Sequence, residues 1–253
     1  MIEEFVTIEH HNQVAILMLN HGVTNAINGD LVLALDSALK SQTADPDVLG
    51  IVLTSSNKKF FSIGLDIPNL YALGENDFRS FYQSFNQMCL GILTTSKPVV
   101  AGIAGHAIAG GCILSLCCDY RFISEGRKLI GLNEIKLGVP VPYVADCVLR
   151  KLIGHRQARD VMDSGGFLEP EEAYRLGMVD RILPVEEVVS QSVEKARELS
   201  SDSLEAFALI KSSRVHALER EITAQLAERE DAFIKCWFSD DARVRLQEAI
   251  SKY

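Results

Sequence analysis

The sequence predicts an α/β protein, and three observations lead to this prediction. Short apolar runs alternate with helical patterns along the chain as far as Pro140. Two of these runs are 48–54 and 99–103, and the first is a continuous apolar strand, as in a parallel sheet covered on both faces. Loops that contain glycine come after both runs, and ligands in open α/β sheets bind beyond the carboxyl ends of strands. We therefore expect βαβ units with a site at that edge.

The N-terminal half is interpreted as strands alternating with helices. A polar turn at 10–13, which contains His10 and His11, separates the first two strands. Asn28 or Asp30 begins the first helix, because a short polar side chain can bond the free amides of a first turn. The predicted strands are 5–9, 14–19, 48–54, 99–103 and 120–123, and the predicted helices are 31–39, 77–93 and 111–117.

Past Pro140 helical patterns dominate, with one short strand predicted at 178–182. Acidic and basic residues alternate around apolar stripes, which is typical of amphipathic helices that cover a core or contact another subunit. The predicted helices are 143–153, 156–163, 170–176, 185–199, 204–218, 222–238 and 242–250. We divide the chain into a core, 1–195, and a C-terminal helical region, 196–253.

Composition excludes several classes of function. The net charge of −9 argues against a nucleic-acid surface and against a polybasic membrane patch, and no apolar run is as long as a membrane span. The six cysteines form no Cys-x-x-Cys pair and sit among apolar neighbours, which favours a reducing compartment. The start Met1-Ile2-Glu3-Glu4 is acidic where a targeting peptide would be basic. We expect a cytoplasmic protein, and no cluster has the spacing of a metal site.

Two glycine loops are the first candidates for a functional site. They are Ser62-Ile63-Gly64-Leu65-Asp66 and His106-Ala107-Ile108-Ala109-Gly110-Gly111. Side by side, two such loops can direct two backbone N–H groups at one oxygen, which is an oxyanion hole; close packing of strand on helix is the structural alternative. The chain lacks the P-loop, the dinucleotide fingerprint and the Gly-x-Ser-x-Gly elbow, so those chemistries are not indicated.

Taken together, the motifs resemble the crotonase family, the enoyl-CoA hydratase/isomerase superfamily, over nearly the whole chain. The matching segments are 25–28, 61–67, 97–101, 105–112, 118–121, 131–138 and 172–180. The resemblance implies a spiral of ββα units with a C-terminal helical trimerisation region, so that the protein is a homotrimer or a dimer of trimers. It implies an acyl-CoA thioester as substrate, and no cofactor apart from the coenzyme A within that substrate.

The resemblance also assigns roles to residues. The amides of Leu65 and Gly110 would hold the thioester oxygen, and Ile63, Gly64, Leu65, Asp66 and Ile67 would line the coenzyme A and thioester region. Hydratases of the family use two glutamates that share a water molecule. The first of these positions is Ile113 here, which cannot activate water, and the second is Glu134.

A single carboxylate suits the movement of a proton between two carbons of one substrate. The chain is thus similar to the mitochondrial-type Δ3,Δ2-enoyl-CoA isomerases, with Asn133 beside the substrate path. Dienoyl-CoA isomerases pair this glutamate with an aspartate eight residues later, where this chain has Pro142. Burial is expected to raise the pKa of Glu134 toward neutrality.

Two other functions stay open at this stage. One is a different crotonase-type enzyme, such as a hydratase whose second acid comes from elsewhere in the chain or a thioester hydrolase. The other is an acyl-CoA-binding protein without catalysis. Of the remaining polar residues, we expect His106 and Asp119 to be structural and Asp66 to be a helix cap or loop hydrogen-bonder. We expect Phe233, Trp237 and Phe238 to pack in the core, with contact to a ligand or a neighbouring subunit as the alternative.

Overall fold

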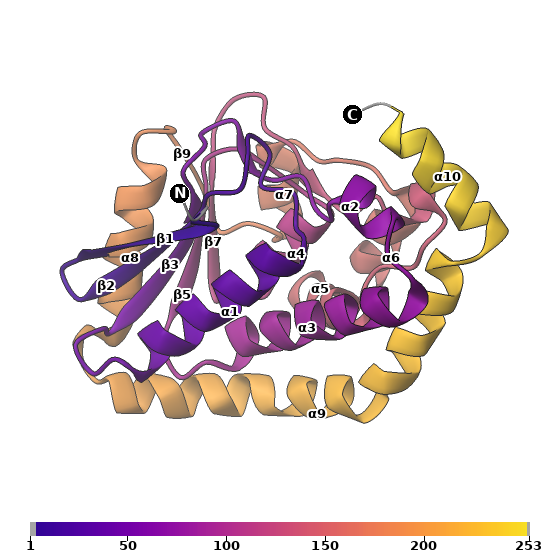
Figure 1. Ribbon diagram of the computed structural model, residues 1–253. Helices are drawn as coiled ribbons and strands as arrows, with labels where there is room; N and C mark the ends of the chain where they lie inside the picture. The colour runs from indigo at the N-terminus through magenta and orange to yellow at the C-terminus, as the bar shows by residue number, and fades with distance from the viewer. Residues whose placement is uncertain (1–3, 252–253) are drawn as a thin grey trace.

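A computed structural model describes residues 4–251, and the α/β class predicted from the sequence is confirmed (Figure 1). The first three residues of the acidic start and residues 252–253 lie outside the described part. None of the described helices has an apolar stretch long enough to cross a membrane.

The core is a six-stranded sheet in the order β1-β2-β3-β5-β7-β9. The first pair is antiparallel and every later pair is parallel, as βαβ connections require. Every residue of β3 is buried, which agrees with the apolar run Ile51-Val52-Leu53 at its centre. The strands are Val6–His11 (β1), Val14–Leu19 (β2), Gly50–Ser55 (β3), Val99–Ile103 (β5), Tyr120–Ser124 (β7) and Arg181–Leu183 (β9).

The predicted turn at 10–13 was wrong in its length. His10 and His11 belong to β1 and pair with Ala15 and Val14 of β2. The turn itself is only Asn12 and Gln13, which both have positive φ, 49° and 63°. A two-residue turn of this kind matches the twist of the strands, so pairing continues up to the turn. The exposed His10 hydrogen bonds through Nε2 to Gln42 Oε1 at 2.7 Å.

A second, three-stranded sheet was not predicted. Its parallel strands are β4 (Phe60–Ser62), β6 (His106–Ile108) and β8 (Ile130–Gly131), in that spatial order. Two or three residues are too few to show an alternating pattern, so these strands looked like parts of loops. The loops that follow them, rather than the ends of β3 and β5, carry the candidate site.

Helices cover both faces of the large sheet (Figure 1). On one face lie α1 (Gly29–Ala44) and α3 (Glu75–Thr94), and on the other lies α8 (Val188–Ser201), which packs Val193 and Ala196 against Val52 and its neighbours. Asn28 is the N-cap of α1 and accepts a hydrogen bond from Leu31 N–H at 3.0 Å. Residue 195, the expected end of the core, falls inside α8, and the domain division stays a prediction.

The C-terminal region contains one long helix where the sequence predicted two. Helix α9 runs without interruption over Leu204–Trp237 beside α3 and α5 (Tyr143–Ile153), and α10 (Asp240–Ile250) follows (Figure 1). The three residues between the two predicted helices, Glu219, Arg220 and Glu221, favour helix, so nothing breaks it. The shorter helices are α2 (Ile67–Tyr71), α4 (Gly110–Leu116), α6 (His155–Ser164), α7 (Pro170–Leu176) and a 3₁₀ turn, η1 (Glu134–Leu137).

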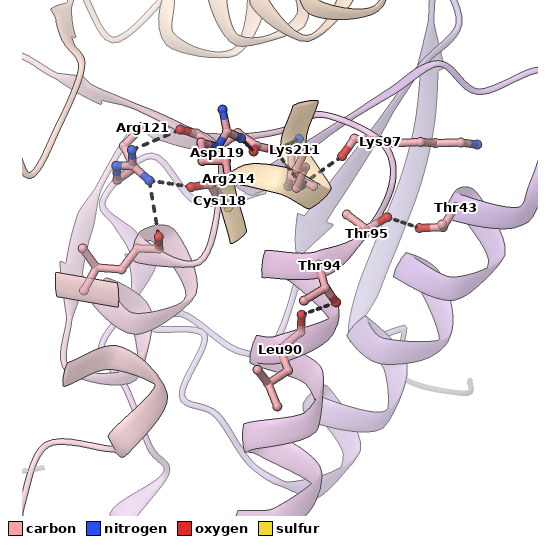
Figure 2. Close-up of polar contacts among 12 residues, drawn as sticks. Thr43, Leu90, Thr94, Thr95, Lys97, Cys118, Asp119, Arg121, Lys211 and Arg214 are labelled. Atoms are coloured by element: carbon pink, nitrogen blue, oxygen red, sulfur yellow. Dashed lines mark hydrogen bonds and ion pairs between the residues drawn. The ribbon is translucent and has the colours of Figure 1, made fainter. Parts of the chain in front are cut away.

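Asp119 ties α9 to the sheet, in keeping with the structural role expected for it (Figure 2). Its carboxylate accepts hydrogen bonds from Val99 N–H at 2.9 Å and from Lys211 Nζ at 2.7 Å, and it also pairs with Arg214. Lys211 Nζ also donates to Lys97 O at 3.1 Å. Burial lowers the pKa of Lys211, while the Asp119 carboxylate opposes that shift. A charged pair this deeply buried, with its hydrogen bonds made, fixes where α9 lies.

Candidate active site

Three loops meet at the carboxyl ends of the small sheet. Residues 63–65 follow β4, residues 109–110 follow β6, and residues 132–134 follow β8. Because the strands are parallel neighbours in the order β4-β6-β8, the loops emerge side by side at one edge. Ala109 N–H donates to Gly131 O at 2.8 Å and continues the ladder to the base of the site.

The first two loops supply two free backbone amides. Ile27 pairs with Leu65 in a parallel bridge, in which Ile27 N–H donates to Gly64 O at 2.8 Å and Asp66 N–H donates to Ile27 O at 2.9 Å. This alternation turns the N–H of Leu65 away from Ile27. Gly110 is the first residue of α4, where no carbonyl lies one turn earlier to accept its N–H. Within residues 4–251, neither amide donates to a protein acceptor.

Glycine allows these two loops to touch. A Cβ on Gly64 would lie 2.8 Å from Ala109 Cβ and 2.9 Å from Gly110 N, and the φ of Gly64 is +96°. Only glycine fits that conformation and that contact without strain. Ala109 has φ 48° and ψ −115°, a conformation that L-residues rarely adopt, just before the Gly110 amide. The backbone is therefore held in a particular shape where the two amides meet.

The far end of α4 is also held. Arg121 donates from Nη1 to Cys118 O at 2.5 Å and to Leu116 O at 3.3 Å, which are carbonyls at the C-terminal end of the helix. Its Nη2 pairs with Asp180 at 3.2 Å. A cation bound to terminal carbonyls stabilises a short helix and so helps to position its first residue, Gly110.

The free amides face a cavity of about 390 Å³, whose lining combines the three loops with α3, α9 and α10. Apolar side chains make most of its wall. The charged side chains that line it, besides Glu134, are Lys136, Arg245 and Glu248, which are all exposed to solvent. These exposed groups mark the open end of the cavity.

Glu134 is the buried acid of the cavity. It begins η1 and is 5% exposed, and its Oε2 has no hydrogen-bond partner in the described part of the chain. Burial raises the pKa of Glu134 to about 7, and the backbone amides of Glu134 and Asn133 oppose the rise. A carboxyl group that titrates near neutrality can both accept and return a proton at working pH.

No second buried carboxylate lines this cavity within residues 4–251. Ile113 lies in its wall and is 1% exposed, and Pro142 lines it as well. By the family resemblance, a hydratase would have a glutamate at position 113, and a dienoyl-CoA isomerase would have an aspartate at position 142. The other lining carboxylate, Glu248, is exposed on α10. The interior wall thus offers one acid and apolar carbon.

Most of the other predicted site residues also reach the cavity. Ile63, Ile67 and Asn133 line it, and the buried Oδ1 of Asn133 has no hydrogen-bond partner among the described residues. Gly64 serves through its backbone, as described above. Asp66 does not line the cavity, because its side chain caps α2 by accepting from Asn69 N–H at 3.1 Å.

His106 lies at the opposite, amino end of the small sheet. Its Nδ1 accepts a hydrogen bond from Leu129 N–H at 3.0 Å, so its role is structural. Burial lowers the pKa of His106, and the nearby cations Lys128, Lys59 and Arg127 lower it further.

Aromatic side chains form part of the cavity wall, and for two of them we expected core packing rather than contact with a ligand. Phe85 of α3 and Phe233 and Trp237 of α9 line the cavity and are also buried in the core. Phe233 and Trp237 therefore pack in the core, as expected, and they also line the cavity. Their spacing of four places them on one helix face, but only the contact between α3 and α9 shows which space that face borders.

The two backbone amides and the buried carboxyl group determine which reactions the site can catalyse. Two amides can hold an oxygen on which negative charge develops, and one carboxyl group in an apolar cavity can move a proton nearby. In the described part of the chain, no three His, Cys, Asp or Glu side chains are grouped in a way that could hold a metal ion.

The chain is similar in sequence to a known protein family and to several known proteins. The family model described as "Enoyl-CoA hydratase/isomerase" matches residues 9–253. The chain is 31% identical over 180 residues to mouse mitochondrial enoyl-CoA delta isomerase 1, a match that covers 71% of this chain and 62% of the mouse protein, less than two thirds of its length. It is 27% identical over 253 residues to crotonyl-CoA hydratase of Syntrophomonas wolfei, covering 100% of this chain and 97% of that protein.

The fold comparison agrees with the sequence comparison. The crystal structure of human mitochondrial delta3-delta2-enoyl-CoA isomerase superimposes with a TM-score of 0.93 at 26% identity, covering 98% of this chain and 97% of that one. An enoyl-CoA hydratase from Bacillus halodurans superimposes with a TM-score of 0.89 at 24% identity, covering 96% and 99%. Isomerases and hydratases are thus both similar to this chain.

Proposed function

The chain belongs to the enoyl-CoA hydratase/isomerase family of crotonase-type enzymes, and on that premise we propose that it is an enoyl-CoA isomerase that moves a double bond from the 3-position to the 2-position. The observation that carries the proposal is the solitary buried acid, Glu134, in a cavity where Ile113 replaces a possible second acid. Hydration needs a positioned water molecule as well as acid–base groups, whereas isomerisation needs only a proton carrier.

The proposed mechanism uses the groups of the cavity in order. Ionised Glu134 removes a proton from the carbon between the thioester carbonyl and the double bond. The electrons move onto the carbonyl oxygen, and the amides of Leu65 and Gly110 stabilise the resulting dienolate. Glu134 then returns the proton to the far carbon, and the double bond comes into conjugation with the carbonyl. The reaction needs no other reactant, and the apolar wall excludes water that could take up the proton.

Assembly and location are further parts of the proposal. We propose a homotrimer or a dimer of trimers formed through the C-terminal helices, as the family resemblance implies. We also propose a cytoplasmic location. The six cysteines are unpaired, as in a reducing compartment, and five of them are buried.

An assay in deuterated solvent tests the reaction. The protein is incubated with a 3-enoyl-CoA and, separately, with a 2-enoyl-CoA, and the products are analysed by mass. We expect interconversion of the two isomers, with no mass change apart from hydron exchange. A product heavier by one water would identify a hydratase, and free coenzyme A would identify a thioester hydrolase. Binding of both substrates without turnover would identify a binding protein.

Ile113→Glu is expected to introduce weak hydration of a 2-enoyl-CoA. The new carboxylate would enter the cavity wall and give water a second partner beside Glu134. The matched control is Ile113→Gln, which places a polar group of the same length there but cannot act as a base. We expect the hydration rate of Ile113→Glu to exceed that of Ile113→Gln at least about tenfold, below the full range of about 10²–10⁴ for acid–base catalysis. Equal rates would show that Ile113 does not decide between the two reactions.

A further inference from the structure

The cavity has two ends of different chemistry, and this difference gives the substrate a direction. Lys136, Arg245 and Glu248 line the cavity and are exposed to solvent, so they mark its open end, whereas Phe85, Phe233 and Trp237 line it and are buried, so they form its inner, aromatic end. Coenzyme A is large and carries phosphates, so it stays at the exposed end, where two of the three charged groups are cations. If the proposed function holds, the acyl chain extends from the thioester toward the aromatic end.

The aromatic end is a wall two rings thick. Phe233 stacks on Tyr82 with ring centroids 4.1 Å apart and planes 15° apart. Trp237 stacks on Phe78 at 4.4 Å and 21°. Phe78 and Tyr82 do not line the cavity, but they are buried at 0% and 1% exposure directly behind the rings that do. An inner ring therefore cannot swing back without displacing an outer ring.

A buried polar contact holds the two helices of this wall together. Asn86, next to Phe85 on α3, donates from Nδ2 to Glu230 Oε1 at 3.1 Å, and Glu230 lies one turn before Phe233 on α9. Both residues are buried, at 1% and 5% exposure. A shift of α3 along α9 would break this hydrogen bond while both side chains stay buried, which is costly. The wall thus has a fixed position, and it limits the length of the acyl chain that the cavity can hold.

We infer that Phe233 and Trp237 set the maximum length of the acyl chain and that the protein is selective for short and medium acyl-CoA thioesters. A volume of about 390 Å³ is near the lower end of the range for ligand pockets, about 300–1,000 Å³, and the thioester shares it. A longer chain would have to displace stacked rings or remain in solvent at the exposed end.

Binding of saturated acyl-CoA thioesters of increasing length tests this inference by calorimetry. Each methylene buried in the cavity is expected to tighten binding about fourfold, until the cavity is full. We expect the gain to stop at about six to ten acyl carbons for a pocket of this size. Saturated thioesters contain no double bond to move, so the result is independent of whether the protein is an isomerase. Affinity that keeps increasing to sixteen carbons would overturn the inference.

Two variants test which side chains set the limit on acyl-chain length. Phe233→Leu and, as a milder change, Trp237→Phe remove part of the inner layer, and the break is expected to move by about one or two carbons, which would tighten binding of the first excluded chains about four- to sixteenfold. The matched control is Phe122→Leu, which removes the same atoms from the separate cluster on the other face of the large sheet. Thermal melts show that each variant is folded. A break that stays at the wild-type length in both wall variants, or that moves equally in the control, would contradict the role of the wall.

Discussion

Glu134→Gln is expected to lower the turnover number for isomerisation by about 10²–10⁴-fold while changing acyl-CoA affinity by less than about threefold. Glutamine keeps the size and shape of the side chain but cannot accept the proton. The oxyanion donors and the apolar wall are unaffected, so the thioester still binds. The measurements are steady-state kinetics with a 3-enoyl-CoA and calorimetric binding of a saturated acyl-CoA. Glu125→Gln, an exposed carboxylate that follows β7, is the control and should leave both values unchanged. Wild-type turnover in Glu134→Gln would refute the assignment of the base.

The pH dependence of the wild type follows from the same group. The pKa of Glu134 is about 7, and the base must be ionised before it can accept a proton. We expect kcat/KM to rise with pH through about 7 and to level off above it. A rise centred near the ordinary value of 4.5 would show that the side chain is solvated rather than buried.

Stability should change in the opposite direction to activity. The pKa of Glu134 is higher in the folded state, about 7, than in the unfolded state, near 4.5. Between these values the unfolded chain releases a proton that the folded protein keeps, so stability falls as pH rises from about 4.5 to about 7 and stays lower above that. Glutamine removes this cost, so Glu134→Gln should raise the free energy of unfolding by about 3 kcal/mol at pH 8 and by little at pH 4. Equal stabilisation at both pH values would contradict the raised pKa.

Gly64→Ala is expected to lower the turnover number by about 10²–10³-fold, the loss seen when one oxyanion donor is removed. The added Cβ would lie 2.9 Å from Gly110 N and 3.0 Å from Ile108 O, at a φ of +96°. Relief of that contact must move the β4 loop away from the β6 loop, and with it one of the two amides. The strained φ adds a loss of stability of about 1–3 kcal/mol.

Gly74→Ala is the matched control for this change. A Cβ on Gly74, the N-cap of α3, would meet no atom within 4 Å, and its φ of −70° suits alanine. We expect it to keep wild-type turnover with a small change in melting temperature. If Gly64→Ala is folded by circular dichroism and turns over like the wild type, the amides of Leu65 and Gly110 are not the oxyanion hole.

Local sequence signals predicted much of the fold. The strand at 99–103 and the helices at 143–153 and 170–176 have their predicted bounds, because apolar periodicity, proline and glycine act within a few residues. The strands of the small sheet escaped prediction because they are too short to show a period. The single helix α9 was predicted as two helices, although Leu218 and Ile222 continue the buried stripe across Glu219–Glu221 and every residue there favours helix.

The candidate site, like the fold, was predicted only in part. The motifs indicated Leu65, Gly110 and Glu134, and the structure brings all three to one cavity. Phe85 was not predicted, and contact with a ligand was only the alternative to core packing for Phe233 and Trp237. The reason is that α3 and α9 are far apart in the sequence and become neighbours only through packing. Asp66, which adjoins the oxyanion loop in sequence, turns away to cap a helix.

The sequence by itself determined which groups are available: one acid at 134, isoleucine at 113, and glycine at 64 and 110. These are properties of single residues and their immediate neighbours. Only the tertiary structure decided that the acid is buried with a pKa of about 7, that the two amides face the same cavity, and where that cavity ends. Burial, electrostatic environment and cavity shape depend on atoms from distant parts of the chain, and no local pattern records which of those atoms will meet.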